Sequence, residues 1–292
     1  MRKPKLKFDE QMKKMRRKGI NFNKTDSKSA YSIIRENTYL YKIFYYRKNF
    51  PKDEQGQYGI EFEYLSDLSS IDMKLRYTLL HMCLDIEHSI KTLLNGIITE
   101  DVTEDGYNVI TDFISNTDVT KDDIFRNKMS GDRVYREYQK QYNNPSYWVC
   151  FEIMSYRVFV QFVEYYYKKT QNHKLKFASD YLKYVKNVRN TCAHNSVLIV
   201  PLMRTRKLSS GLLSHFHYKD VPMTGDHSKA FLDIAAVLTV HEKYCSSGIK
   251  KYRKNDLIDL KSRVNRNSNY YTKHSDIKFF FNKLNLLIDN YN

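Results

Sequence analysis

Glycine and proline are scarce in this sequence, with 9 and 5 residues among 292. Their combined share is less than half of the roughly 12% that proteins usually contain. Sheets, sandwiches and barrels need many turns made from these two residues, whereas long helices need few. The shortage therefore argues against an all-β fold. It predicts an all-α protein, long enough for one large or two modest domains with a proper core.

The sequence also lacks paired cysteines and long apolar runs. Its four cysteines, Cys83, Cys150, Cys192 and Cys245, lie far apart and form no Cys-x-x-Cys pair. This spacing argues against a zinc ribbon or a disulfide framework, so we expect a reduced, cytoplasmic protein. No stretch approaches the ~20 apolar residues of a membrane span, and the charged start leads into no apolar signal core. We therefore expect neither secretion nor insertion into a membrane.

Positive charge, by contrast, is abundant. Lys and Arg number 49 against 33 Asp and Glu, which gives a formal net charge of +16. Such an excess is typical of proteins that bind a polyanion, either nucleic acid or an anionic membrane surface. Codon bias is the alternative explanation for the excess charge. Lys, Asn, Ile and Tyr are abundant together, and A+T-rich codons encode this mixture. We favour nucleic acid, and we predict no membrane partner.

The basic residues gather at the two ends of the chain and near residues 168–207. Solvated helix faces usually carry charges of both signs, whereas these clusters, which include Arg2 and Lys3, are nearly all positive. The candidate RNA contacts are Lys13, Lys14, Arg16, Arg17, Lys168, Lys169, Arg204 and Arg206.

Hydrophobic periodicity predicts an N-terminal basic helical unit over residues 1–65 and a second helical domain over residues 66–292. In the first unit we expect a helix over 8–18 that ends at Gly19, a helix from the Thr25–Ser27 cap to 46, and an extended segment over 58–64. In the second we expect a seven-turn helix that begins at Ser69 or Ser70, a loop with a short helix over 100–122, helices over 147–169, 177–192, 228–245, 254–266 and 275–290, and a loop over 209–227.

The most specific feature of the chain is Arg189, which is followed after four residues by His194. On a helix, Asn190 and His194 lie one turn apart on the same face. Arg189 lies about 140° around the axis from His194, so one helix does not stack the two directly. They can meet across a groove, or between two copies of the helix at a two-fold axis.

These residue types suit RNA cleavage without a metal, in which the 2′-hydroxyl of the substrate attacks the adjacent phosphorus. An imidazole, whose unperturbed pKa is about 6.5, can take or give a proton near neutral pH, and this is the role that we expect for His194. The Arg189 guanidinium can bind two phosphate oxygens, and the Asn190 amide can orient either group. The alternative is structural: His194 and Asn195 cap a helix end while Arg189 lies on a solvated face.

Two more charged residues, Arg76 and Glu87, border the apolar face of the predicted seven-turn helix. Structural ion pairing is the usual explanation for such residues. The alternative for Glu87 is that it orients His194 or Arg189 without itself contacting the substrate.

His81, Asp85 and His88 share a helix stripe that resembles a set of metal ligands. An exposed polar face explains the stripe better, because no cysteine or further acidic residue with ligand spacing accompanies it. We predict no metal site.

The segment from Arg189 to His194 resembles the R-x4-6-H signature of HEPN-domain proteins. The wider sequence looks like the abortive-infection (AbiD/AbiF-like) branch of that superfamily, and the likeness extends over most of the chain. Four further elements occur in the expected order: the opening at Lys3–Ile20, the Tyr45–Arg47 triplet, Asp72–Arg76 with Glu87, and Pro145–Glu152 with its Trp148.

This resemblance implies an all-helical core that dimerises with both motifs at the interface. It implies Arg189, Asn190 and His194 as the catalytic residues of a ribonuclease that harms the host cell during phage infection. One departure is the segment Ser196–Pro201, where the family often has a basic or aromatic stretch. The downstream phosphate contacts therefore stay open, and Arg204 with Arg206 are candidate replacements.

We therefore predict a HEPN-like helical bundle with an N-terminal helical extension, working as a homodimer. The predicted activity is metal-independent RNA cleavage, without a cofactor, in an abortive-infection or toxin–antitoxin system of phage defence. Such a toxin must be restrained between infections, and the basic surface makes a small inhibitory RNA a reasonable partner. The alternative is a non-catalytic HEPN-type RNA-binding protein in which the motif holds RNA or the dimer.

Overall fold

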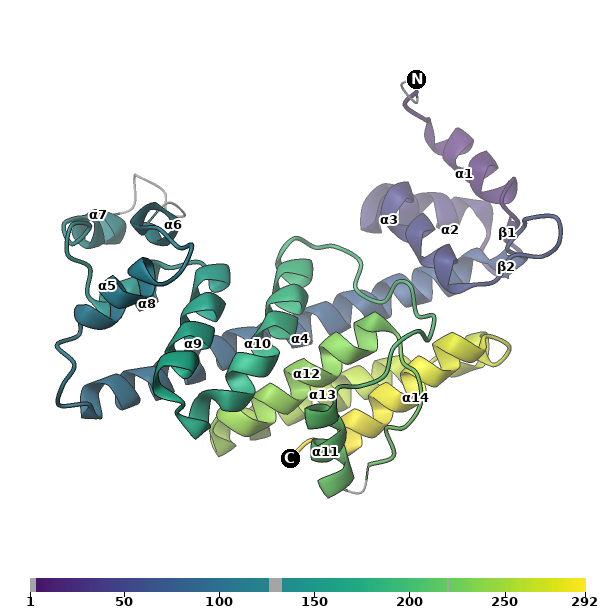
Figure 1. Ribbon diagram of the computed structural model, residues 1–292. Helices are drawn as coiled ribbons and strands as arrows, with labels where there is room; N and C mark the ends of the chain where they lie inside the picture. Colours follow the sequence, from purple (N-terminus) through teal and green to yellow (C-terminus); the bar gives the residue numbers. More distant parts are fainter. Residues whose placement is uncertain (1–3, 126–132, 220) are drawn as a thin grey trace.

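One helix of 39 residues, α4 (Phe62–Glu100), runs through the molecule, and the other elements are arranged along it (Figure 1). It makes about eleven turns. Its length follows from the sequence, because an apolar residue recurs every three or four positions and keeps one face hydrophobic. The buried residues of that face are Leu65, Leu68, Ile71, Leu75, Leu79, Met82, Ile86, Ile90, Leu94 and Ile98.

The computed structural model describes residues 4–125, 133–219 and 221–292. Within these ranges the regular structure is helical except for one isolated β-bridge and a parallel pair of two-residue strands, β1 (Ile20–Asn21) and β2 (Ile60–Glu61). The predicted all-α class is therefore confirmed. Arg2 and Lys3, which we assigned to the N-terminal basic cluster, lie outside the described residues.

The N-terminal elements gather at the start of α4, where β1 pairs with β2 (Figure 1). The Asp26 side chain accepts hydrogen bonds from two backbone N–H groups, which confirms the cap predicted at Thr25–Ser27. The helical elements of this unit are α1 (Phe8–Arg16), α2 (Ser27–Ser32), a π-helical turn (Ile33–Asn37), α3 (Leu40–Tyr45) and a 3-10 turn (Tyr46–Asn49).

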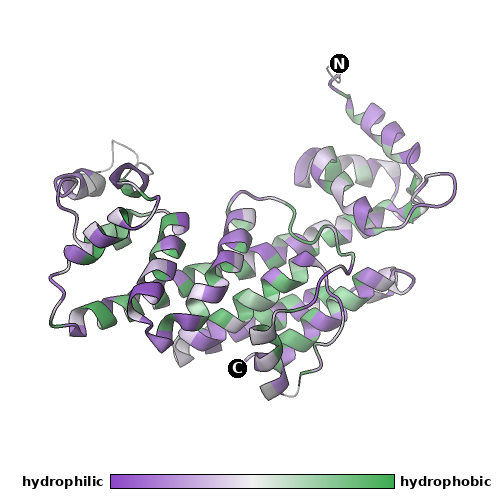
Figure 2. Cartoon of the chain, viewed as in Figure 1, coloured by the Kyte–Doolittle hydropathy of each residue, from purple (hydrophilic) through white to green (hydrophobic). Residues whose placement is uncertain are grey.

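The middle of α4 is covered by helices from the second half of the chain, and α10, α12 and α13 pack directly on it. Their hydrophobic faces turn toward one another and leave polar residues outside (Figure 2). A cluster of short helices lies at the far end of α4 from the N-terminal unit (Figure 1). The helices of this part of the chain are α9 (Tyr156–Thr170), α10 (His173–Ala193), α11 (Ser210–Tyr218), α12 (Lys229–Tyr244), α13 (Ser247–Asn265) and α14 (Ser275–Asp289), and a 3-10 turn (Ser268–Tyr271) precedes α14. Of these, α9 packs on α10, α11 on α12, and α14 on α12 and α13. The short helices are α5 (Asn108–Ser115), α6 (Lys121–Phe125), α7 (Arg133–Gln139) and α8 (Tyr147–Ile153).

The predicted start of the long helix at Ser69 or Ser70 was wrong. Phe62 and Leu65 are fully buried and continue the apolar face backwards, so the helix begins directly after β2. Ser69 and Ser70 lie inside the helix and cap nothing. The predicted division between residues 65 and 66 falls in the first turn of α4 and stays a prediction.

Several other predicted boundaries were also wrong. The helix predicted over 254–266 already begins at Ser247. The helix predicted to run from Asp26 to Tyr46 breaks at Thr38, whose backbone is extended. The helix predicted over 147–169 breaks before Ser155, because this hydroxyl accepts a hydrogen bond from the backbone N–H of Val158 and so begins a new helix. The predicted loop over 209–227 contains α11.

All four cysteines are free and buried. Burial raises the pKa of Cys150 and Cys192 to about 12, which keeps both thiols protonated. In the part of the chain that the structure describes, we find no helix that is both long and apolar enough to span a bilayer.

The connection between α1 and the sheet depends on a glycine. Gly19 has a φ of 75°, and a Cβ atom on it would lie 2.8 Å from the Cβ of Gln57 and 2.9 Å from the backbone nitrogen of Tyr58. We expect Gly19→Ala to lower the free energy of unfolding by about 1–3 kcal/mol, measured by urea denaturation.

The matched control is Gly248→Ala in α13. No atom lies within 4 Å of the Cβ that would be added there, and alanine favours the helix. We expect this control to be neutral or slightly stabilising, and equal effects of the two substitutions would contradict the role of Gly19.

Candidate functional site

The Arg-x4-His motif occupies the C-terminal end of α10, and His194 is its capping residue. The backbone N–H of His194 donates to the carbonyl of Asn190 at 3.0 Å, so the predicted one-turn spacing is confirmed. Asn195 has a left-handed φ of 53°, a conformation that commonly ends helices. The side chains of His194 and Asn195 are exposed.

Arg189 extends toward α9. Its guanidinium lies over the ring of Tyr156, 5.7 Å from the ring centre, and donates to the Asn190 side-chain oxygen at 3.3 Å. Its Nε is buried and has no hydrogen-bond partner among the described residues. Within the described part of one chain, no interaction joins Arg189 to His194, as expected from their angular separation on the helix.

His194 lines a cavity of about 300 Å³ together with side chains of the N-terminal unit. Tyr41 and Tyr45 of α3 form part of its wall, as do Lys42 and Asn195. Arg189 does not line this cavity. We call it the His194 cavity.

A buried ion pair fixes the chain that follows the motif. Asp72 of α4 is fully buried, and its Oδ2 accepts hydrogen bonds from Arg76 Nε at 2.8 Å and from the Tyr46 hydroxyl at 2.9 Å. Its Oδ1 accepts the backbone N–H groups of Leu198 and Ile199 at 2.9 and 3.0 Å. Four hydrogen bonds thus satisfy a carboxylate that is closed off from water. We call this group the Asp72 network.

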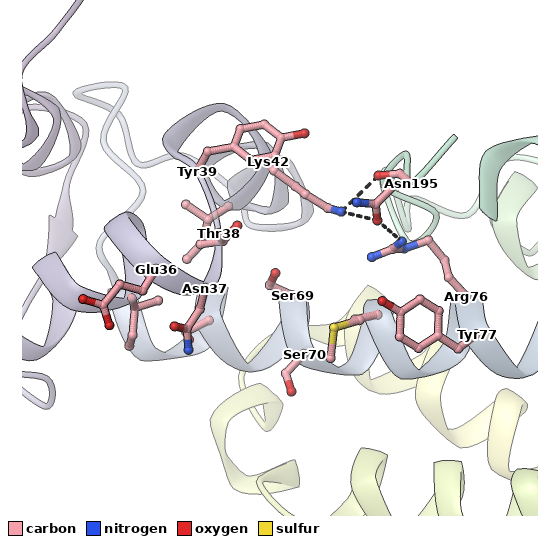
Figure 3. Close-up of a pocket in the computed structure, with 14 residues that line it drawn as sticks. Glu36, Asn37, Thr38, Tyr39, Lys42, Ser69, Ser70, Arg76, Tyr77 and Asn195 are labelled. Atoms are coloured by element: carbon pink, nitrogen blue, oxygen red, sulfur yellow. Dashed lines mark hydrogen bonds between the residues drawn. The ribbon is translucent and has the colours of Figure 1, made fainter. Parts of the chain in front are cut away.

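Two cations converge on the residue after His194 (Figure 3). Arg76 Nη1 donates to the Asn195 side-chain oxygen. Lys42 Nζ donates to the same oxygen at 2.8 Å and to the Asn195 carbonyl at 3.0 Å. Burial and the neighbouring Arg76 charge lower the pKa of Lys42, against the opposing effect of Asp72.

Arg76 therefore lies beside the motif, although it contacts Asn195 rather than His194. Lys42 was not predicted, because its one signal in the sequence is its position just before the Tyr45–Arg47 triplet.

Glu87 pairs with Lys91, one turn later on α4, at 2.9 Å. The charges of Glu87 and Arg189 both act on the hydroxyl of Tyr156. Burial raises the pKa of Tyr156, the Glu87 charge raises it further, and the Arg189 charge lowers it. This geometry favours the ion-pair interpretation of Glu87, and its action on Arg189 stays a prediction.

The predicted RNA contacts near the N-terminus lie together. Lys13 and Lys14 of α1 are exposed, as are Arg16 and Arg17 at its end. The Arg16 guanidinium also donates to the Ser27 hydroxyl at 2.9 Å.

The other predicted RNA contacts lie apart from α1. Lys168 and Lys169 are exposed at the end of α9, where Lys169 forms an ion pair with Asp112. Arg204 pairs with Asp276 at 2.8 Å. Arg206 lines a separate cavity of about 420 Å³ that also includes Lys207 and Lys229. Binding of RNA by these residues stays a prediction.

Asp85 is the central residue of the predicted stripe with His81 and His88, and its contacts are structural. Asp85 accepts from Arg253 Nε at 2.6 Å and pairs with the buried His241 at 3.2 Å. Among the described residues, no group of three His, Cys, Asp or Glu side chains is placed to hold a metal ion.

Fold and site together define an all-helical protein with an Arg-x4-His motif at a helix end, held by a buried ion pair on its longest helix. A family model described as Abi-like protein matches residues 33–200, which is more than half of the chain. The protein therefore belongs to the Abi-like protein family, whose name refers to abortive infection, a defence against phage. No curated protein and no solved structure matches the chain.

The matched range contains Lys42, the Asp72 network and the whole motif. The candidate site therefore lies within the part of the chain that defines the family.

The Asp72 network makes a strong prediction for stability. Removing one partner of a buried ion pair leaves the other charge uncompensated, which costs about 3–5 kcal/mol. We expect Asp72→Ala to lower the free energy of unfolding by that amount in urea denaturation, because Arg76 and two backbone N–H groups lose their acceptor.

Asp259→Ala is the control for this prediction. The Asp259 side chain is 75% exposed and lies 3.8 Å from Lys74, so we expect a change within about 0.5 kcal/mol. Comparable losses in both variants would argue against the Asp72 network as the anchor of the site.

Proposed function

We propose that the protein is a metal-independent endoribonuclease of the HEPN superfamily, in its AbiD/AbiF-like branch, and that it acts in abortive infection. The main support is the position of His194. This residue is exposed, lies one turn from Asn190 and five residues after Arg189, and lines a cavity together with the buried Lys42. Membership in the Abi-like family adds the link to phage defence.

In the proposed reaction the 2′-hydroxyl of the RNA attacks the adjacent phosphorus and loses its proton. The bond from phosphorus to the 5′-oxygen of the next nucleotide breaks, and that oxygen gains a proton. His194 acts as acid or base in this transfer, and Arg189 binds the phosphate oxygens as their charge grows. Asn190, which accepts a hydrogen bond from Arg189, positions the guanidinium.

We further propose that the active form is a homodimer. Arg189 lies toward α9, whereas His194 faces the N-terminal unit, so one chain alone does not join them. A second copy related by a two-fold axis can bring the Arg189 of one chain to the His194 of the other.

RNA is the proposed partner in two roles, as substrate and as a small inhibitor that restrains the toxin between infections. The net charge of +16 supports both roles. Cleavage of cellular RNA would take place in the cytoplasm.

The second candidate is a non-catalytic RNA-binding protein. The observation that favours it is the engagement of Arg189 with Tyr156 and Asn190, which leaves its guanidinium partly occupied within the chain.

The two motif residues can be tested singly and in mixture. We expect His194→Ala and Arg189→Ala each to abolish RNA cleavage without unfolding the protein, as followed by gel analysis of total RNA and by circular dichroism. If each site combines residues of two chains, mixing the variants restores about a quarter of the wild-type rate, because half of the dimers are mixed and each has one intact site.

Wild-type cleavage by either variant alone would contradict the catalytic roles. Complete inactivity of the exchanged mixture would contradict the composite site while leaving the roles of the single residues intact.

The chemistry of the cut ends is a separate prediction. Attack by the 2′-hydroxyl leaves a 2′,3′-cyclic phosphate or a 3′-phosphate, and it resists EDTA because no metal takes part in the proposed steps. An RNA with a single 2′-deoxy residue at the cut site should not be cleaved, as measured by mass spectrometry of the products. Products with 5′-phosphate ends, or a need for Mg²⁺, would reject the mechanism.

A further inference from the structure

A larger cavity of about 750 Å³ adjoins the His194 cavity, and the two share Tyr39, Lys42 and Asn195 (Figure 3). It lies between the N-terminal unit and the first turns of α4, with the π-helical turn Ile33–Asn37 along one side. We call it the α4 cleft. Its size is in the range of ligand sites, and it is larger than a single phosphate requires.

The end of the α4 cleft nearest His194 is cationic. Arg76 and Lys42 both line it, and their residues are only 1% and 8% exposed. Arg76 uses its Nε and Nη1 for Asp72 and Asn195, while Nη2 has no hydrogen-bond partner among the described residues. Lys42 forms no ion pair among the described residues, because its two hydrogen bonds go to the neutral oxygens of Asn195. An anion placed here would relieve both conditions.

The walls of the cleft suit a base. Tyr39 and Tyr77 are each 56% exposed, and they enter the cleft from the N-terminal unit and from α4, respectively (Figure 3). Exposed tyrosines beside cations are the usual platform on which unpaired bases stack. The Thr38 hydroxyl oxygen is buried without a hydrogen-bond partner in the described residues, which adds an unused polar group to the same wall.

One carboxylate, Glu36, lines the cleft, and it lies at the end away from Lys42 (Figure 3). It accepts a hydrogen bond from the Ser32 hydroxyl at 3.1 Å. A negative charge at this end repels phosphate, so the phosphate site is confined to the end next to Asn195 and His194.

We propose that the α4 cleft binds one nucleotide of a single-stranded RNA, with a backbone phosphate on Lys42 and Arg76 and the base stacked on Tyr77. The inference rests on the proposed ribonuclease function, because the strand would continue past Asn195 into the His194 cavity. It assigns the N-terminal unit a direct part in RNA binding through the wall that it shares with α4.

Binding can be measured without cleavage in the His194→Ala protein. The probe is a fluorescent single-stranded RNA of ten nucleotides, followed by anisotropy at fixed salt. Two further substitutions are made on the α4 wall: Tyr77→Ala removes a stacking surface, and Ser70→Asp adds a negative charge to the lining. Both residues lie outside the Asp72 network, so the fold is expected to persist, and melting temperatures check this.

We expect Tyr77→Ala to raise the Kd by about 5- to 150-fold, the range of one lost base stack. Ser70→Asp should raise it about tenfold or more, since it adds a carboxylate to the cleft wall that repels the RNA backbone. The controls are Tyr252→Ala, an exposed tyrosine of α13, and Ser262→Asp, a serine inside the same helix. We expect both to stay within about twofold of the parent Kd, because they keep the cleft intact.

Equal Kd values in cleft and control variants, or no RNA binding at all, would overturn the proposal. Adenosine monophosphate is the second probe: if it binds more tightly than the RNA, the ligand is a free nucleotide and the proposal is wrong. Cleavage by the wild type with unchanged binding in the cleft variants would leave the ribonuclease standing and reject the cleft. Weakened binding in those variants with no cleavage by the wild type would support the cleft as an RNA site and reject the ribonuclease.

Discussion

The buried carboxylate of Asp72 is the constraint on which the rest of the site depends. It joins three segments that are far apart in the sequence: the turn after α3 through Tyr46, its own helix through Arg76, and the chain beyond α10 through the backbone of Leu198 and Ile199. An ionised group shut away from water is tolerated only when its hydrogen bonds are made. Each of the three segments is therefore held to a narrow range of positions. Burial and the Asp72 charge raise the pKa of Tyr46, which keeps its hydroxyl a donor.

The Asp72 network also fixes the position of His194, because Asn195 connects the two. Arg76 is positioned by Asp72, and it donates to Asn195 together with Lys42. Asn195 in turn holds the left-handed turn that ends α10 directly after His194. The imidazole is thus exposed on a backbone that the core of α4 immobilises. A site placed on a rigid element in this way loses little conformational entropy when it binds a substrate.

Local sequence patterns predicted those features that depend on a single helix. The all-α class followed from the scarcity of glycine and proline, and the spacing of Asn190 and His194 followed from helix geometry. The start of α4 was missed because it is set by burial of Phe62 and by pairing of the two short strands, which no capping residue announces. Lys42 was missed for a related reason. Its partner Asn195 lies 153 positions away, and no local pattern links two such residues.

The separation of Arg189 from His194 within one chain bears on how the activity of the proposed toxin is regulated. If each catalytic unit needs the Arg189 of one chain and the His194 of another, the isolated chain is inactive even when its backbone is fully formed. Activity then depends on the square of the chain concentration at low abundance. RNA bound in the α4 cleft of one chain would lie within reach of its His194 and would still need the Arg189 of a partner. Binding of the substrate and dimerisation would then both be required for cleavage, and a chain that binds RNA alone would leave it uncut.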